Sequence, residues 1–307
     1  MITLSSERGI VRIASWSDVE SVPGFSANID PKTVKLKEII GSYTFDALIP
    51  CGLSTCHQPH GAGFMVVAED GRVTNIGRIC GKKHFEVEFS QMSRVFLATL
   101  RAQQDREFLY GVKCRLPIIS AEVASIRNER YGATWINVRV NQLMGSSTAL
   151  PTSIVNAVRH AVRRGDGSLI VERAATSSER EQRSVAVDVK GLEHLRRNIP
   201  FVIEEKVGQL DGFAALAPGN GLREALGCIE PFLAVLAEVD IDSLPDKKLR
   251  ELSRVGGELD ANLERLRRVI IAGKRLLTRN NIQQLSPFVT SGADSRIFSS
   301  FLSDLPS

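Results

Sequence analysis

The sequence predicts an α+β fold that is predominantly helical, with a small β-hairpin module near the N-terminus. The hairpin is indicated by two apolar runs on either side of the turn Glu69-Asp70-Gly71, between Gly63 and Gly77. The helical character is indicated by apolar residues that recur at three- and four-residue steps over long stretches after residue 85. A third pattern, between residues 150 and 193, is a short amphipathic helix followed by two β-prone runs.

We divide the 307 residues into four segments, since a chain of this length can form more than one core. Residues 1–110 hold the hairpin module and the helix after it, and residues 111–198 form a mixed α/β region. Residues 199–285 are helical, and residues 286–307 form a Ser-rich tail. The apolar runs at residues 33–40, which fit either strand or helix, and at residues 43–49 should pack against the hairpin module, because so small a module has scarcely any core of its own.

Four residues around the hairpin have the spacing of a metal site. Cys51 and Cys56 precede the hairpin and are separated by four residues, whereas Cys80 and His84 follow it and are separated by three. A helix that begins near Gly81 places Cys80 and His84 one turn apart on the same face. Because the hairpin carries the chain out and back, the two pairs can share one metal ion.

This order of a loop pair, a hairpin and a ligand pair at a helix start resembles the treble-clef zinc finger, over residues 50–85. The resemblance implies a module held by a structural Zn²⁺ ion. A closed, thiolate-rich ligand set suits that role. The expected zinc ligands are Cys51, Cys56, Cys80 and His84.

The first pair departs from the usual two-residue spacing of such a finger, so His57 and His60 stay open as alternative ligands. Free thiols and a disulfide between Cys51 and Cys56 are the alternatives to metal. The chain shows no signal peptide and no apolar run of membrane-spanning length, so we expect a reducing, cytoplasmic location and no membrane partner. A reducing location favours metal over a disulfide.

The pattern between residues 150 and 193 comprises a helix that starts at Pro151, strands at Ser168–Ala175 and Ser184–Lys190, and a polar turn at Thr176–Arg183. It resembles the second half of a winged-helix DNA-binding domain. The resemblance implies that the exposed helix face and the hairpin tip contact nucleic acid. The residues expected to bind nucleic acid are Arg159, Arg163, Arg164, Arg180 and Arg183.

Charge supports this interpretation only in part. The chain has a net charge of +4, and the excess lies mainly in residues 85–199, which contain 17 Lys and Arg against 12 Asp and Glu. The predicted turn also carries Glu179 and Glu181, which would repel phosphate.

The other patterns predict helices. One runs from Phe85 to about Leu109, and a second begins after Pro117. The β-prone run from Trp135 to Val140 leaves open whether this second helix continues. Three further helices are expected in the C-terminal third, at Phe201–Leu216, Leu222–Val239 and Pro245–Leu277.

The last of these helices has the heptad pattern of a short coiled coil. Leu252, Leu259 and Leu266 occupy one heptad position, and Gly256, Leu263 and Ile270 occupy the other. This seam can pack against helices of the same chain, against a protein partner, or against a second copy in a homodimer.

These features favour a non-enzymatic protein that binds nucleic acid or acts in its regulation, with zinc as a structural cofactor. The zinc module also resembles those of small bacterial and phage proteins, which implies a mobile-element origin.

A first alternative is an HNH-like metal-dependent nuclease, since HNH enzymes also build on a treble clef. That chemistry needs a histidine on the hairpin, and the hairpin has none, so His57 and His60 with Asp70 are the only candidates. A second alternative is a helical interaction scaffold.

Overall fold

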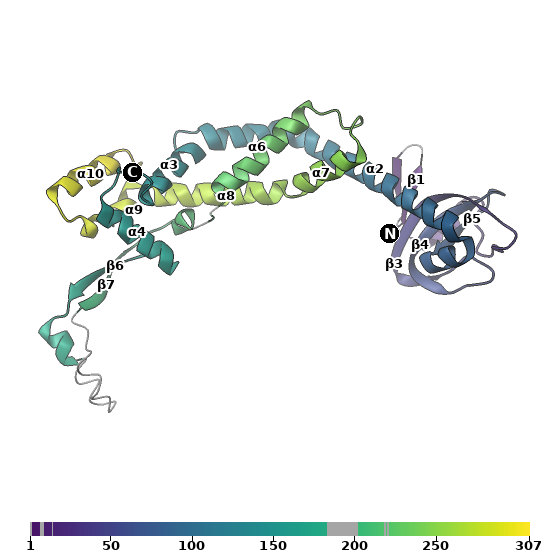
Figure 1. Cartoon of the computed structure of the whole chain (residues 1–307), viewed down its shortest axis with the longest axis horizontal. Coiled ribbons are helices and arrows are strands. Elements are labelled where there is room, and N and C mark those ends of the chain that lie inside the picture. The colour runs from purple at the N-terminus through teal and green to yellow at the C-terminus, as the bar shows by residue number, and fades with distance from the viewer. Residues whose placement is uncertain (1, 7–8, 14, 183–201, 218, 220) are drawn as a thin grey trace. The chain divides into compact units, whose positions relative to one another are not determined.

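The computed structural model describes residues 1–307 except 1, 7–8, 14, 183–201, 218 and 220. The fold mixes helices with small antiparallel sheets and is mainly helical, as predicted (Figure 1). The chain forms two compact units. Unit 1 comprises Met1–Cys114 and Val239–Arg254, and unit 2 comprises Arg115–Glu238 and Val255–Ser307.

Unit 1 contains a five-stranded antiparallel sheet of order β2-β1-β3-β4-β5. The predicted hairpin is confirmed, because β4 and β5 pair from Gly63 opposite Gly77 to Val67 opposite Val73. The segment at residues 33–40, whose sequence fits either a strand or a helix, leads into strand β3, which begins at Leu36. The elements are β1 (Ile2–Ser6), β2 (Gly9–Ile13), α1 (Trp16–Glu20), β3 (Leu36–Pro50), β4 (Pro59–Ala68) and β5 (Val73–Gly77).

The sheet of unit 1 is covered on both faces, because successive side chains of a strand point to opposite sides. On β4, Phe64 and Val66 join one apolar cluster with Phe89, whose ring meets that of Phe64 edge to face at 5.6 Å. Met65 lies in the other cluster, with Tyr43 and the half-buried Trp16. The cysteines belong to the first cluster.

Helix α2 (Arg78–Asn128) is longer than predicted and has a kink at Glu86, where φ is 41° and ψ is −119°. The predicted break before Pro117 is wrong, since Pro117 lies inside the helix. A proline within a helix costs about 3 kcal/mol. The buried residues Val112, Ile119 and Val123 on both sides of Pro117 offset that cost by packing.

Unit 2 is built mainly of helices. The buried side of α8 packs against α6 and also contacts α3, so the predicted leucine seam has partners within the chain. The run from Trp135 to Val140 is helical. The elements are α3 (Ala133–Leu143), α4 (Thr152–Arg164), β6 (Ser168–Ala174), β7 (Val202–Gln209), the 3₁₀ helix η2 (Phe213–Leu216), α6 (Leu222–Glu238), α8 (Leu259–Leu276), α9 (Arg279–Gln283), the 3₁₀ helix η3 (Ser286–Phe288) and α10 (Gly292–Ser303).

Two predicted helices of the C-terminal third are corrected. The helix expected at Phe201–Leu216 is the strand β7 followed by η2, because Val202, Ile203 and Val207 favour a strand that can pair with β6. The helix expected at Pro245–Leu277 is divided, at Glu258, into α7 (Asp246–Gly257) and α8.

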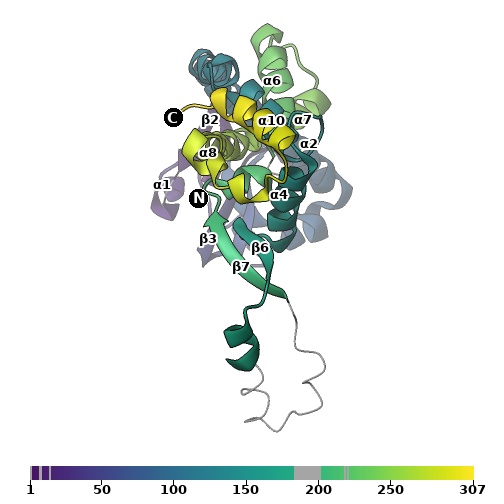
Figure 2. The ribbon, with the colours of Figure 1, turned by 90° about the vertical axis from the view of Figure 1, so that its left-hand side faces the viewer.

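The hairpin expected after α4 also differs in its partner strand. Strand β6 pairs with β7, from Ser168 opposite Gln209 to Ala174 opposite Val202, and the resulting ribbon extends away from the helices of unit 2 (Figure 2). The partner predicted at Ser184–Lys190 lies outside the described residues.

The predicted polar turn at Thr176–Arg183 is instead helical at residues 177–182. Thr176 and Glu179 form a capping box at its start. The Thr176 backbone N–H donates to Glu179 Oε2 at 2.8 Å, and the Glu179 N–H donates to Thr176 Oγ1 at 3.3 Å.

The segment predicted as a tail contains α10, and its residues Phe298 and Phe301 are buried. The hydroxyl of Ser291 caps the start of this helix by accepting from the Asp294 N–H. Among the helices of the described residues, none is both long enough and apolar enough to cross a membrane.

Candidate metal centre

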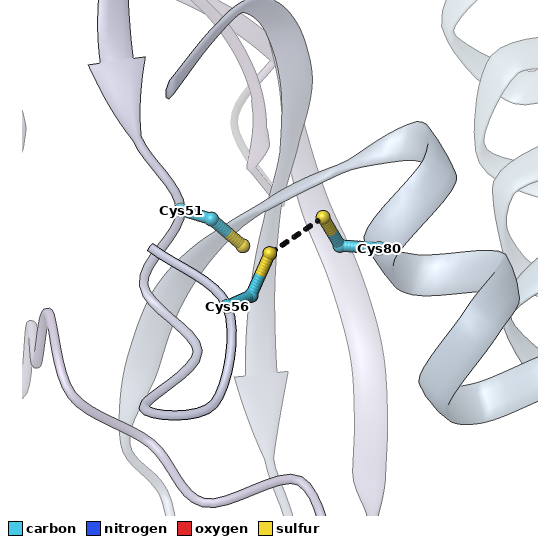
Figure 3. A group of neighbouring side chains, drawn as sticks. All are labelled: Cys51, Cys56 and Cys80. Carbon is cyan, nitrogen blue, oxygen red and sulfur yellow. Dashed lines mark hydrogen bonds between the residues drawn. The ribbon is translucent and has the colours of Figure 1, made fainter. Parts of the chain in front are cut away.

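Three cysteines from three different segments of unit 1 converge on one point (Figure 3). Cys51 follows strand β3, Cys56 lies in the turn before β4, and Cys80 lies in the first turn of α2. Their Sγ atoms all lie within 4.8 Å of one another, and no disulfide joins them. A tetrahedral zinc ion with Zn–S bonds of about 2.3 Å holds its sulfur ligands about 3.8 Å apart. The cluster therefore has the dimensions of a thiolate metal site.

The turn between β3 and β4 presents Cys51 and Cys56 to the same side. The Cys51 N–H donates to the Gln58 carbonyl at 3.1 Å, which closes the turn at its base. The Cys56 N–H donates to the Leu53 carbonyl at 3.0 Å, which folds the chain back within the turn. The next residue, His57, has a positive φ of 45°. This local backbone geometry allows two cysteines with a four-residue spacing to meet.

Strand β5 supports this turn through two buried polar residues. The Asn75 side chain donates through Nδ2 to the Pro50 carbonyl at 2.8 Å, and the Gly52 N–H donates to the Asn75 carbonyl at 2.9 Å. A Cβ atom at Gly52 would lie 2.0 Å from Thr74 Oγ1, so only glycine fits there. Cys51 is thus positioned by the residues on either side of it.

The start of α2, which carries Cys80, is supported by the ring of Phe89. A Cβ atom at Gly81 would lie 2.3 Å from the ring of Phe89, so the ring packs directly on the backbone next to Cys80. In a straight helix, residues eight positions apart are about 12 Å apart along the axis. The kink at Glu86 is what brings Phe89 back onto Gly81.

The electrostatics of the three thiols differ. Burial raises the pKa of Cys80 to about 12 and also raises the pKa of Cys51. Burial acts in the same direction on Cys56, but hydrogen bonds with Cys80 and with the Gln58 backbone outweigh it and lower the pKa of Cys56. The Sγ atoms of Cys56 and Cys80 lie 3.1 Å apart. A divalent cation at this point would replace the thiol protons, because metals bind the thiolate form.

The structure brings together three of the four expected zinc ligands. His84 lies on α2, half-buried, one turn after Cys80, but it does not belong to the cluster. No other histidine, cysteine or carboxylate of the described residues joins the cluster.

The two alternative histidines lie on either side of Gln58. Both ring nitrogens of His60 have partners, since Nδ1 bonds to the Gln58 carbonyl at 3.1 Å and Nε2 bonds to the hydroxyl of Tyr43. Burial raises the pKa of Tyr43 far above its ordinary value, so this hydroxyl stays protonated and can donate to His60. His57 is exposed, and its Nδ1 atom lies 3.2 Å from the Cys51 carbonyl.

The residues expected to bind nucleic acid do not have equivalent surroundings. Arg159 and Arg163 lie on the exposed side of α4, where Arg159 donates two hydrogen bonds to the Met144 carbonyl, at 2.9 and 2.6 Å. Arg164 is instead part of the turn between α4 and β6, because it donates to the Ser168 carbonyl and pairs with Asp166. Arg180 is exposed on the helical residues 177–182, and Arg183 lies outside the described residues.

Sequence reasoning did not identify Thr74 and Asn75 as supports of the site. Both are polar residues 1 % exposed, within a strand of which every residue is buried. A polar pair in an otherwise apolar five-residue strand is the sequence signal for such a supporting role, since buried polar groups need hydrogen-bond partners.

The cysteine cluster is recognised from the geometry of this chain alone. The chain matches no protein-family model, no curated protein and no solved structure.

Proposed function

We propose that Cys51, Cys56 and Cys80 bind one structural zinc ion, with His84 as the fourth ligand. The observation that carries this proposal is the approach of three Sγ atoms to within 4.8 Å of one another without a disulfide. Zinc is favoured over harder divalent cations because its structural sites are tetrahedral and rich in thiolate.

His84 is the best fourth ligand among the three nearby histidines. It stands one helical turn after Cys80 on α2, so a change of side-chain rotamer can turn its ring toward the cluster. His60 already bonds through both nitrogens. His57 is exposed and follows Cys56 directly, so it is the alternative that an experiment must distinguish.

The zinc ion would act by holding the fold of unit 1 together. Its three thiolate ligands come from the end of β3, the following turn and the start of α2. The cysteines pack among buried apolar residues, including Leu53, Phe64 and Ile76. Binding energy at such a site becomes folding energy, because the unfolded chain does not bring these ligands together.

Elemental analysis of the purified full chain tests the metal. We expect one zinc per chain in the wild type and loss of zinc in Cys80→Ser. Cys114→Ser is the matched control, because Cys114 lies on the same helix but is exposed and outside the cluster. A metal-free wild type would remove the proposal, and so would a Cys80→Ser variant that keeps its full zinc content.

Cobalt substitution tests the fourth ligand. Co²⁺ bound to the wild type should show thiolate charge-transfer bands and the visible spectrum of a tetrahedral site. His84→Ala should alter that spectrum, whereas His57→Ala should not. The reverse result would identify His57 as the fourth ligand, and the zinc proposal would still hold.

We propose further that the protein uses the exposed face of α4 to bind nucleic acid. Asn156, Arg159, His160 and Arg163 are all exposed and share one side of this helix. Arg159 bonds to a carbonyl and not to a carboxylate, so its positive charge is not neutralised by that contact. Within the described residues neither Arg159 nor Arg163 has an ion pair, so both charges are available to phosphates.

The salt dependence of binding to random-sequence duplex and single strands tests this second part. We expect binding at low salt. In the double variant Arg159→Gln/Arg163→Gln, the slope of log K against log salt concentration should be less steep, by the amount that about two phosphate contacts contribute. Arg268→Gln, an exposed change of the same charge on α8, is the control. Absence of binding at low salt would end the nucleic-acid proposal, and so would equal slopes for the wild type and the double variant.

A further inference from the structure

A surface cavity of about 540 Å³, largely open to solvent, lies in unit 2 between helices α3 and α10. Its lining includes Arg139 from α3 and Arg296, Ile297, Ser300 and Phe301 from α10. The residues of α10 that line it recur at four-residue steps, so they form one side of that helix. Its volume is in the range of small-molecule sites in proteins, which is about 300–1,000 Å³.

Arg139 lies at the wall of this cavity and has three side-chain partners. Its guanidinium donates to Gln142 Oε1 at 3.1 Å and to Asp304 Oδ2 at 2.9 Å, and it stacks on the ring of Phe301 at 5.3 Å from the centroid. Its side chain is only 18 % exposed. Two of the five guanidinium N–H groups are used in these bonds, so three are left for a ligand.

Arg296 provides the second charge of the cavity. It is exposed, and it has no ion pair within the described part of unit 2. The negative charge of Asp304 is offset by Arg139, so the lining as a whole has one uncompensated positive charge. That balance favours a ligand with a single negative group.

The remaining lining is apolar or small. Ile297 is 42 % exposed, although it is a large aliphatic residue, and Ser300 leaves space beside it. Phe301 is buried beneath Arg139. A ligand with an apolar or aromatic body could therefore cover Ile297 while its anionic group meets the two arginines.

We infer that this cavity binds a small organic anion, in which one carboxylate or phosphate ester lies between Arg139 and Arg296 and an apolar body lies against Ile297. This inference is independent of zinc, since no residue of the cavity belongs to unit 1.

Isothermal titration of the full chain tests the inference with simple probes. Benzoate and phenyl phosphate supply the two anionic groups on the same aromatic body, benzyl alcohol supplies the body without the charge, and inorganic phosphate supplies the charge without the body. We expect at least one aromatic anion to bind more tightly than both benzyl alcohol and inorganic phosphate. The stronger of benzoate and phenyl phosphate identifies the preferred anionic group.

Three variants locate the site. Arg296→Gln should weaken binding about tenfold or more, as expected for the loss of a charged hydrogen-bond donor. Ser300→Trp should abolish binding by filling the cavity with both arginines retained, and Arg268→Gln should bind as the wild type does. Unchanged thermal midpoints would show that the variants are folded.

Four results would overturn the inference. These are no binding of either aromatic anion at millimolar concentration, equal binding of benzyl alcohol, equal binding of inorganic phosphate, and wild-type affinity in Arg296→Gln.

Discussion

Glu86 has a backbone conformation that residues with a side chain rarely adopt. Its φ of 41° with ψ of −119° lies outside the helical region, within an otherwise helical segment. Such positions cost about 1–3 kcal/mol and persist only where the surroundings impose them. Here the surroundings are the buried ring of Phe89 and the backbone of Gly81 on which it packs. The strain is therefore linked to the packing that places Cys80 in the cluster.

Glu86→Gly should stabilise the protein. Glycine adopts positive φ without steric cost, so the strain at this kink is relieved, although the unfolded chain gains flexibility. We expect a net gain of about 1 kcal/mol in the free energy of unfolding, measured by urea denaturation followed by circular dichroism.

Glu88→Gly is the matched control, because Glu88 is also exposed on α2 but lies after the kink. Glycine within a regular helix should lower stability by about 1 kcal/mol. The two substitutions should thus have opposite signs. If both destabilise to the same extent, Glu86 is not strained in solution.

The ribbon of β6 and β7 shows how an element can be missed when its partner is remote in sequence. The hairpin of β4 and β5 could be predicted, since its two strands and the turn at Gly71 are adjacent along the chain. The sequence of β7 fits a helix when it is considered alone, because its pairing with β6 depends on a contact across a long intervening segment. The capping box of Thr176 and Glu179 has a sequence signature, but its polar residues fit a turn equally well.

The capping box should depend on pH. Hydrogen bonds from Arg173 and from Thr176 hold the pKa of Glu179 far below its ordinary value of 4.5. A carboxyl with a lowered pKa stabilises the folded form fully above the ordinary pKa, and this contribution is lost as pH falls below it. We therefore expect the helical residues 177–182 to fray as pH drops below about 4.5, which NMR chemical shifts of these residues can detect.

Glu179→Gln should remove that pH dependence, because the amide cannot titrate and makes a weaker pair with Arg173. The neighbouring exposed Glu181→Gln is the control and should keep the wild-type titration. Identical titrations in Glu179→Gln and in the wild type would show that another group governs the helix.

At the scale of the whole molecule, the division into two units predicts how metal removal acts. On the zinc proposal, a chelator should lower hydrogen-exchange protection in β3, β4, β5 and the first turns of α2, because the proposed ligands join these elements. Protection of α8 should not change, since its core lies in unit 2. Mass spectrometry of peptic peptides measures both. Equal loss of protection in the two units would contradict a zinc role limited to unit 1.

The cysteine cluster could be predicted from the sequence, but its surroundings could not. Cys51, Cys56 and Cys80 could be found because ligand pairs on both sides of a hairpin must meet. The roles of Gly52 and Asn75 could not, because they depend on how closely β5 approaches the turn after β3. His84 stands one helical turn after Cys80 but does not belong to the cluster, and spacing along a helix does not determine a side-chain rotamer.

The discontinuity of unit 1 affects the order in which a newly made chain can fold. Cys51, Cys56 and Cys80 are close in sequence, so all three are synthesised well before Val239–Arg254. Unit 1 also needs Val239–Arg254, whose Val239 carbonyl accepts from Lys113 Nζ at 2.6 Å and whose Asp242 accepts from the Tyr110 hydroxyl at 2.7 Å. Synthesis of all of Arg115–Glu238 comes between the two parts of unit 1, so the nascent chain must hold the cysteine cluster in an incomplete unit until Val239–Arg254 has been made.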